Sequence, residues 1–478
     1  MKCIDHRRHT SFVAIGFVAI SFLSSCAVGP NYKQPQTSVP NSFANAPTNA
    51  VADDAALATW WKGFKDARLD RLVERAITNN HDLRIAAANL KEARALRRLV
   101  TFDLAPTVQA NAGYENALLS KAAAPARSRE ARELEFYDAS FDATWELDLF
   151  GRVRRSVQAA NAQLASVEAD RLDMLVSVIA EVARNYFELR GLQNQFAVAR
   201  RNAAVQTETL EITQARLEGG RGTDFDVSRS RSLLNLTLST IPPLETAIQR
   251  AIYRLAVLTG QLPTALTSEL STSEPLPSAM PTLALADPQA LLRRRADIRA
   301  VERSLAAATA RIGVATADLF PRVTFIGSIG LEANTFSGLG KSGADTWNFG
   351  PRITWAALDL GRVKARIKAA DARAEASLAL YERTVLTALE EAEGALVDFG
   401  REQSRQRFLQ TSAEASQKAA DLAHQRYESG VTDFLSVLDA ERTLLDAQDR
   451  LAASQTRTVT ALVAVYKALG GAPMTGAD

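Results

Sequence analysis

The sequence predicts a mixed fold in which a membrane β-barrel is joined to very long, coiled-coil α-helices. Three observations carry this prediction: an internal repeat that divides the chain in two, strands of membrane length with alternating side chains, and helical stretches too long for a compact domain. A chain of 478 residues has room for two or three ordinary domains, so the repeat is the better guide to its organisation.

The repeat is visible in two recurring motifs. Gly151-Arg152-Val153 recurs as Gly361-Arg362-Val363, 210 residues further on. The stretch 218–225 recurs as 428–434, at an offset of 210 for its glutamate but 209 for its Thr-Asp-Phe, which we interpret as a small indel. Each half therefore reads as a helix, a proline, strands, Gly-Arg-Val, a very long helix, a glycine turn and a helix.

Four strands are predicted, at about 107–116, 136–149, 322–333 and 346–358. In the second of them Phe141 and Trp145 share one face, while Asp142 and Glu146 share the other. A soluble sandwich would also alternate, but acidic residues on the second face fit a water-filled lumen better. About ten residues is also the length that a tilted membrane strand needs.

Four strands cannot close a barrel alone, and an open sheet edge is not tolerated in lipid. Two chains would supply eight strands and a barrel filled by its own side chains, whereas three chains would supply twelve and leave a passage, so a homotrimer is favoured.

The predicted helices are unusually long. No proline interrupts 152–218, and a continuous helix of that length would reach roughly 100 Å. In 363–399 small and apolar residues recur at steps of three and four, as in a coiled coil. An ordinary four-helix bundle is the alternative, but it leaves the strands before each long helix unexplained.

The N-terminus reads as a lipoprotein signal. Basic residues precede an apolar run, 12–23, that is too short to span a bilayer, which needs about twenty residues. The run ends in Leu23-Ser24-Ser25-Cys26, which resembles a bacterial lipobox and so implies that Cys26 is lipidated. An ordinary signal peptide with an incidental cysteine is the alternative. By resemblance to sorting rules, Ala27 in place of aspartate implies the outer membrane.

Several functional classes are disfavoured. The net charge of +2 comes from the signal region, so nucleic acid is not an expected partner. After Cys26 there is no cysteine, and His81 and His424 lie far apart, so neither a metal site nor a cofactor is predicted. Gly340-Lys341-Ser342 imitates a phosphate loop but lacks its leading glycine, since position 335 is threonine. No catalytic constellation is evident, and we expect no enzyme.

Four segments together carry a resemblance to a known family: 26–32, Trp60-Trp61, 147–152 and 426–430. They resemble the NodT-like lipoprotein branch of TolC-type outer-membrane efflux proteins, and the resemblance covers essentially the whole mature chain. It implies a homotrimer with a twelve-stranded barrel and a periplasmic tunnel of twelve helices. It also implies lipid anchoring in the outer membrane, a periplasmic adaptor, and an inner-membrane pump of the resistance-nodulation-division class.

On this reading the chain divides into six parts. They are a signal peptide (1–25), a lipid-anchored segment (26–63), a first efflux repeat (64–262), a Pro-bearing equatorial linker (263–288), a second efflux repeat (289–470) and a C-terminal tail (471–478).

The candidate functional site consists of the two predicted turns, near 219–224 and 429–433, and the start of the helix after the second turn. Gly220 and Gly430 suit the left-handed residue that ends a helix, and Thr223 or Asp224 and Thr432 or Asp433 suit the next N-cap. That role is structural, but the resemblance also places adaptor contacts at these tips, and the residues concerned are Gly219, Gly220, Thr223, Asp224, Gly430, Thr432 and Asp433.

The resemblance further implies a periplasmic gate made of Leu435 and Asp439, which lie four apart on one helical face, with Tyr427 as a latch across helices. Three copies of Asp439 would repel one another and form a selective ring. Ser436 stands where the family often has a second acid, so the ring is expected to be weaker. The alternatives are an exposed acid paired with Arg442, a core leucine and a packing tyrosine.

The resulting expectation is a passive exit duct for drugs or other small molecules. A duct for protein secretion by a type I-like system and a non-conducting structural or adhesin trimer are the two alternatives.

Overall fold

The computed structural model describes residues 27–46, 57–277, 281, 283, 285 and 287–471. Cys26 and the predicted signal peptide lie outside these residues, as does the tail after Gly471. Among the described residues, no helix has both the length and the hydropathy to cross a bilayer. The chain forms two compact units, one built from segments up to Gln36, 90–167 and 300–381, and the other from 37–89, 168–299 and the segment from Glu382 onward.

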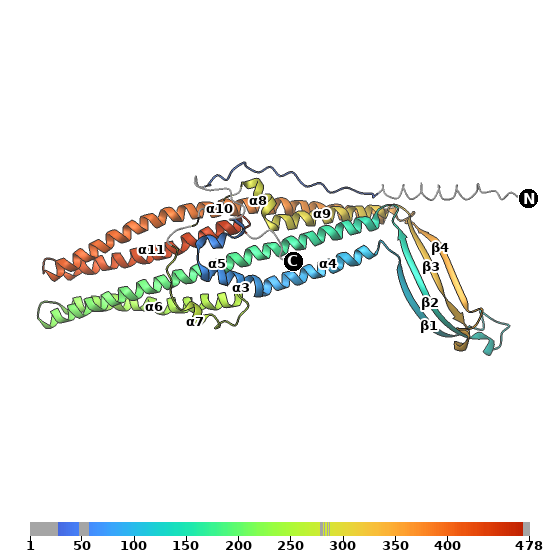
Figure 1. The fold of residues 1–478 in the computed structure, drawn as a ribbon, viewed down its shortest axis with the longest axis horizontal. Coiled ribbons are helices and arrows are strands. Elements are labelled where there is room, and N and C mark those ends of the chain that lie inside the picture. The colour runs from blue at the N-terminus through green and yellow to red at the C-terminus, as the bar shows by residue number, and fades with distance from the viewer. Residues whose placement is uncertain are drawn as a thin grey trace, which may run out of the picture. The chain divides into compact units, whose positions relative to one another are not determined.

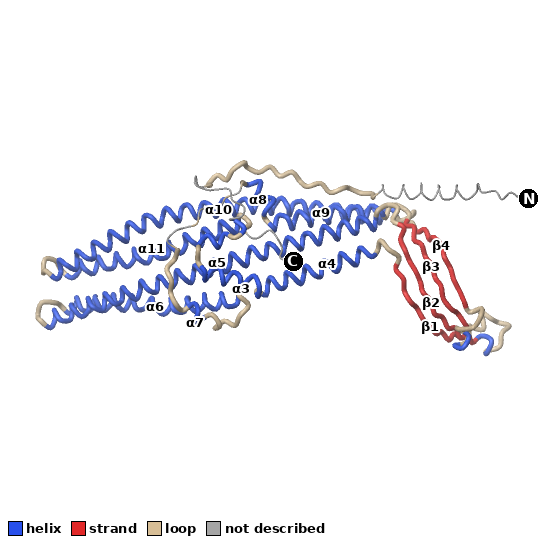
Figure 2. Tube along the Cα trace, in the orientation of Figure 1, coloured by secondary structure: helices blue, strands red, loops and turns tan. Residues whose placement is uncertain are grey.

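The first unit contains a four-stranded antiparallel sheet, drawn in red in Figure 2. Its strands lie in chain order: β1 (Thr107–Leu118), β2 (Glu133–Leu147), β3 (Arg322–Ala333) and β4 (Asp345–Thr354). Strand β2 starts earlier than predicted, and β4 ends four residues before position 358, because 355–359 turn into the next helix. The β2–β3 pairing runs from Tyr137↔Ala333 to Leu147↔Val323 and joins the two repeats.

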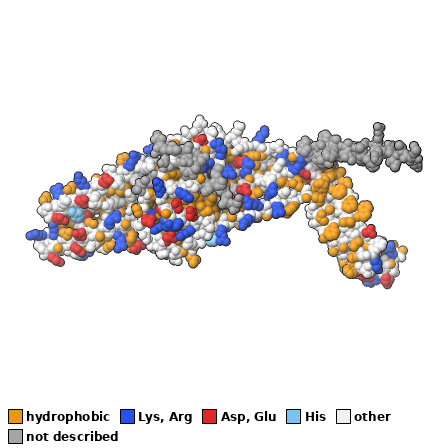
Figure 3. Space-filling view, viewed as in Figure 1, with side chains coloured by type: hydrophobic (Ala, Val, Ile, Leu, Met, Phe, Trp, Pro, Cys, Tyr) orange, Lys and Arg blue, Asp and Glu red, His pale blue; other side chains and the backbone are white. Residues whose placement is uncertain are grey.

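The register of the sheet sorts its side chains by chemistry. One row across the four strands is Gln109, Asp142, Ser328 and Asn348. Within it Ser328 Oγ donates to Asp142 Oδ1 at 2.6 Å. The opposite face carries exposed aromatic and aliphatic side chains, visible as the orange strip over the strands in Figure 3: Val108, Phe141, Trp145, Phe325, Ile329, Trp347, Phe349 and Ile353. An exposed apolar face of this kind requires a non-aqueous neighbour.

Helices account for most of the described chain, and their order is shown in Figure 1. Helices α5 (Arg152–Glu218) and α10 (Leu360–Glu428) have 67 and 69 residues, which corresponds to roughly 100 Å each at 1.5 Å per residue. Each is followed by a helix of 35 residues, α6 (Asp224–Leu258) or α11 (Phe434–Ala468). The remaining helices are shorter: α3 (Ala67–Asn79), α4 (His81–Phe102), α7 (Thr267–Leu270), α8 (Pro288–Arg294) and α9 (Ala296–Ala317).

The core of the second unit is built around the Trp60-Trp61 pair. Both indoles lie in the 3₁₀ turn η2 (Trp60–Phe64), and both are buried. The Trp60 ring stacks on Tyr466 with centroids 5.0 Å apart, and its Nε1 donates to the carbonyl of Gly471 at 3.1 Å. The motif near the N-terminus therefore packs against the end of the last helix, which joins the N-terminal segment to the second repeat.

Asn80 lies between α3 and α4, and its buried side chain also connects them to the end of α6. Its Oδ1 accepts from the N–H groups of Asp82 and Leu83 and so caps the start of α4, while its Nδ2 donates to the carbonyl of Leu258 at 2.8 Å. The side chain is 3% exposed. Replacement by alanine would leave buried backbone groups without partners.

We therefore expect Asn80→Ala to lower the free energy of unfolding by about 1–3 kcal/mol. The neighbouring Asn79→Ala is the matched control, because Asn79 is exposed and its Nδ2 bonds only within its own helix, to the carbonyl of Arg75. Helical circular dichroism during denaturant unfolding of the detergent-solubilised protein measures both. Equal losses in the two variants would contradict the assigned role of Asn80.

Candidate functional site at the helical tips

Two five-residue turns, 219–223 and 429–433, close the two helical hairpins. Gly220 and Gly430 adopt the left-handed conformation, with φ of +67° and +71°. After them Arg221 N–H bonds the carbonyl of Arg216 at 2.8 Å, and the second turn repeats this bond at 2.9 Å. These are the bonds of a Schellman motif, which requires a residue that tolerates positive φ. The sequence expectation for the two glycines is confirmed.

The helix starts after the turns differ from each other. Thr223 caps α6 in a capping box with Asp226, in which Thr223 Oγ1 accepts from the Asp226 N–H at 3.2 Å. In the second hairpin Asp433 is the cap, and its Oδ1 accepts from the Ser436 N–H at 3.2 Å. Asp224 is therefore the first helical residue, and Thr432 belongs to the turn.

The inferred indel between the two tips is wrong. Both turns have five residues, so Thr223 corresponds to Asp433 and the offset stays at 210 throughout. The Thr-Asp-Phe motif is instead displaced by one residue relative to the helix start. One residue rotates a side chain by about 100° around a helix. Accordingly Phe225 is 65% exposed, whereas Phe434 is 4% exposed.

Tyr427 lies in a buried cluster that joins the two hairpins. Phe434, Val437 and Leu438 surround it, and Ile212 and Leu233 from the first hairpin pack against the same cluster. The guanidinium of Arg216 on α5 lies 3.8 Å from the centroid of the Tyr427 ring and donates to the Tyr427 carbonyl at 2.9 Å. Tyr427 thus contacts both hairpins through its ring and its backbone.

Leu435 and Asp439 lie outside this cluster. Leu435 is 51% exposed and Asp439 is exposed, one turn further along the same face of α11. The structure therefore brings this pair together but separates it from Tyr427, which lies on α10 and is buried in the cluster. The alternative reading of Leu435 as a core residue does not hold within the protomer, and the described ion pairs do not join Asp439 to Arg442.

Sequence reasoning missed the counterparts of this pair in the first hairpin. With a constant offset of 210, Leu435 corresponds to Phe225, and Asp439 corresponds to Arg229. Both are exposed, and the Arg229 guanidinium lies 5.3 Å from the Phe225 ring centroid. An offset of 209, as in the Thr-Asp-Phe motif, would place Asp439 opposite Ser230, so only the turn lengths reveal the correspondence.

A buried carboxylate provides a second link between the hairpins. Glu441 on α11 is 5% exposed and accepts from Thr209 Oγ1 on α5 at 2.9 Å. The same Oε1 lies 2.9 Å from His424 Nε2. The hydrogen bond to Glu441 raises the pKa of His424, an effect that burial partly opposes and that the charges of Glu441, Glu428 and Asp421 reinforce.

Comparison with known proteins identifies the family. The model of the outer membrane efflux protein family matches residues 72–261 and 288–471. The chain belongs to the outer membrane efflux protein family.

Relatives cover almost all of this efflux protein. The solvent efflux pump outer membrane protein SrpC of Pseudomonas putida is 32% identical over 476 residues, covering 96% of this chain and 98% of SrpC. Outer membrane protein OprJ of Pseudomonas aeruginosa is 33% identical, covering 94% of this chain and 93% of OprJ. Nodulation protein T of Rhizobium leguminosarum bv. viciae is 30% identical, covering 93% and 90%.

Solved structures show the same fold. The outer-membrane channel OprN superimposes with a TM-score of 0.86 at 42% identity, covering 93% of this chain and 99% of OprN. The open state of the Neisseria gonorrhoeae MtrE channel gives 0.81 at 28% identity, covering 94% and 99%. The TolC-type resemblance is therefore confirmed, and this efflux protein is an outer-membrane component of an efflux system.

We expect the His424–Glu441 pair to make the stability of the protein depend on pH. Since the folded-state pKa of His424 is raised, its contribution is fully present below about pH 6.5, the unfolded value, and is lost as pH rises through the folded value. We expect the thermal midpoint to fall between pH 6 and pH 9, and to fall less in His424→Gln.

His81→Gln is the control, because His81 is exposed and, within the described part of the chain, its hydrogen bond is to Arg84 of the same helix. Helical circular dichroism in buffers of equal ionic strength measures the midpoints. A His424→Gln variant with the full wild-type fall would show that another group controls the dependence.

Proposed function

We propose that this chain forms a homotrimeric exit duct that conducts drugs or other small molecules passively across the periplasm and outer membrane. The observation that carries the proposal is the open four-stranded sheet, which has exposed apolar side chains on one face and a row of polar side chains on the other. Strands β1 and β4 each have an edge that pairs with no other described strand. In lipid such edges must pair. Three copies would do so by closing twelve strands, with the polar row inside.

Two further parts of this proposal concern the cell envelope. We propose that Cys26 carries the lipid that anchors the chain to the outer membrane. We also propose that a periplasmic adaptor and an inner-membrane pump of the resistance-nodulation-division class complete the pathway. In support, the described tip residues proposed for adaptor docking are largely exposed and held by their own turns: Gly219, Gly220, Thr223, Asp224, Gly430, Thr432 and Asp433.

The proposed substrate class is supported by the names of similar proteins. Similar proteins carry names that refer to solvents, toluene and pyoverdine, all compounds far smaller than a folded protein. Such cargo supports small-molecule efflux for this chain over protein secretion. A wide water-filled passage discriminates little among small solutes, so selection would fall to the pump.

We propose that Leu435 and Asp439 form the gate, and that Tyr427 stabilises the position of α11, the helix that carries them. In a trimer, an exposed leucine at the same level of three protomers would make an apolar constriction, and Asp439 one turn on would add a ring of charge. Tyr427 and its cluster support this by fixing the start of α11 against the first hairpin.

The single-channel conductance of the purified protein in planar bilayers tests duct and gate together. We expect a nearly closed wild type and a large, steady conductance in Leu435→Ala/Asp439→Ala, because both the apolar plug and the acid are removed. The control is Asp421→Ala/Leu422→Ala, an exposed acid and leucine on α10 close to the same tip, which should stay closed.

The remaining outcomes separate the two parts of the proposal. A conducting wild type that the substitutions leave unchanged keeps the duct and removes the gate. If inserted trimers of neither protein conduct, the duct is wrong and a structural trimer replaces it.

A further inference from the structure

One buried arginine receives the start of the mature chain. Arg155, in the first turn of α5, is 4% exposed. Its Nε donates to the carbonyl of Val28 at 3.0 Å, and its Nη2 lies within hydrogen-bonding distance of three more oxygens of the same segment: Ala27 O (3.3 Å), Gly29 O (3.1 Å) and Asn31 Oδ1 (2.9 Å). Its Nη1 donates to Gln158 Oε1 at 2.9 Å. The described bonds use uncharged oxygens throughout, so this arginine binds a segment rather than neutralising an acid.

The segment lies on a surface shaped to receive its backbone. Gly151 has φ of +82°, and a Cβ at this position would lie 2.5 Å from the Cα of Ala27. Gly29 has φ of +86°, and a Cβ there would lie 2.5 Å from the Cα of Gly313 on α9. The Val28 N–H bonds the Phe150 carbonyl at 3.1 Å. Both close approaches require glycine, because any other residue would overlap backbone.

The far end of the segment is also held. The hydroxyl of Tyr32 donates to Glu302 on α9, a carboxylate that is 6% exposed, and the Arg303 guanidinium lies 5.9 Å from the Tyr32 ring centroid. Burial and the bond to Glu302 raise the pKa of Tyr32, so this hydroxyl stays protonated and continues to donate. The segment 27–32 is thus fixed at both ends.

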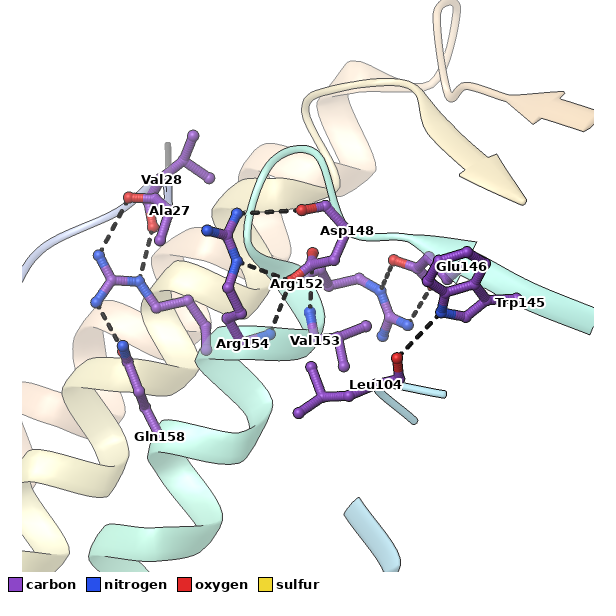
Figure 4. A network of polar contacts seen from close by, with 11 residues as sticks. Ala27, Val28, Leu104, Trp145, Glu146, Asp148, Arg152, Val153, Arg154 and Gln158 are labelled. Carbon is purple, nitrogen blue, oxygen red and sulfur yellow. Dashed lines mark hydrogen bonds and ion pairs between the residues drawn. The ribbon is translucent and has the colours of Figure 1, made fainter. Parts of the chain in front are cut away.

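This docking place lies beside the ends of the strands. Phe150 follows the last residue of β2 by three positions and stacks on Phe320, two positions before β3, with centroids 4.6 Å apart. Figure 4 shows Ala27 and Val28 near the connection between β2 and α5, which carries Asp148 and runs from the end of β2, beside Glu146, to Arg152 at the start of α5. Ala27, the first described residue, therefore lies against the start of α5 at this end of the sheet.

We propose that Arg155, with Gly151 and Gly313, forms a receptor for the chain's own N-terminal segment that holds the lipid anchor level with the ends of the strands. The inference rests on the proposed lipidation of Cys26. An acyl chain gains free energy for each CH₂ group that it buries in the bilayer. If the tether is held at the sheet, insertion of the lipid favours a position of the protein in which the strands lie in the bilayer. A loose tether would only keep the protein near the membrane.

The test is a double-mutant cycle with four proteins: wild type, Arg155→Ala, Cys26→Ser and the double variant. The readouts are palmitate labelling, the fraction of protein recovered as heat-dissociable trimer in outer membranes, and the thermal midpoint of the helices in detergent. We expect Arg155→Ala to be labelled like wild type but inserted severalfold less. In the Cys26→Ser background the same substitution should cause no further loss.

Two variants keep the test decisive. Arg311→Ala, an arginine on α9 whose contact is Gln163, should insert like wild type. Asn31→Ala removes a single acceptor and should show a smaller loss than Arg155→Ala without a change in the thermal midpoint, even if Arg155→Ala folds poorly. Losses that simply add in the double variant would overturn the inference and leave Arg155 as a packing residue. An unlabelled wild type would instead remove the lipid anchor itself.

A second inference follows independently from the equal turn lengths. Arg229 and Asp439 are each the sixth residue of their helix, and Phe225 and Leu435 are each the second. Six hairpins would alternate around the mouth of the proposed trimer. We infer that the mouth is lined by alternating arginine and aspartate, with Phe225 beside Leu435, so that the three arginines offset the acidic ring of Asp439 and neighbouring hairpins attract each other.

Charge exchange tests this arrangement by conductance and by reversal potential in a salt gradient. Arg229→Asp and Asp439→Arg should each raise the leak conductance, since each places like charges side by side, and Arg229→Asp should increase cation preference. The exchanged double variant should close again. Arg221→Asp, an exposed arginine in the turn, should change neither quantity. If the double variant leaks at least as much as either single variant, this inference is wrong, whereas the proposed duct and the Leu435/Asp439 gate are unaffected.

Discussion

The backbone of a sheet edge cannot stay unpaired in hydrocarbon, and much of this structure follows from that constraint. One chain supplies four strands, β1 to β4, and the pairing of β2 with β3 joins strands that lie in different repeats. The repeats are therefore parts of a single sheet and could not function as separate modules. The exposed apolar face and the polar row through Asp142 then define which side of that sheet meets lipid and which side meets water.

The two hairpins show how a repeat diverges without changing its backbone. Both turns contain a left-handed glycine at their second position, and both following helices have 35 residues. A displacement of the Thr-Asp-Phe motif by one residue exposes Phe225 in one hairpin and buries Phe434 in the other. The second tip consequently gains the core around Tyr427, which ties it to α5 through Arg216.

Much of the fold and part of the site could be predicted from the sequence. The repeat, the four strands and the long helices follow from periodicity, and the left-handed glycines follow from turn chemistry. The capping residues were only half resolved, because Thr223 and Asp433 each sit beside a second residue able to cap. Whether Tyr427 packs in a core or acts as a latch was left open, since its ring can do either. The correspondence of Phe225 and Arg229 with Leu435 and Asp439 was missed, because the motif alignment placed the register after the turn one residue away.

By itself, the sequence determined the local conformations and the family, because hydrophobic period, turn residues and motifs act over a few neighbours. Only the tertiary structure decided which distant groups meet. Arg155 reads in the sequence as one of several basic residues after Gly151, yet it binds residues more than a hundred positions earlier. Glu441 likewise meets Thr209 across two hairpins. Such contacts depend on how whole helices rotate and pack, and a single residue of register moves every side chain by about 100°.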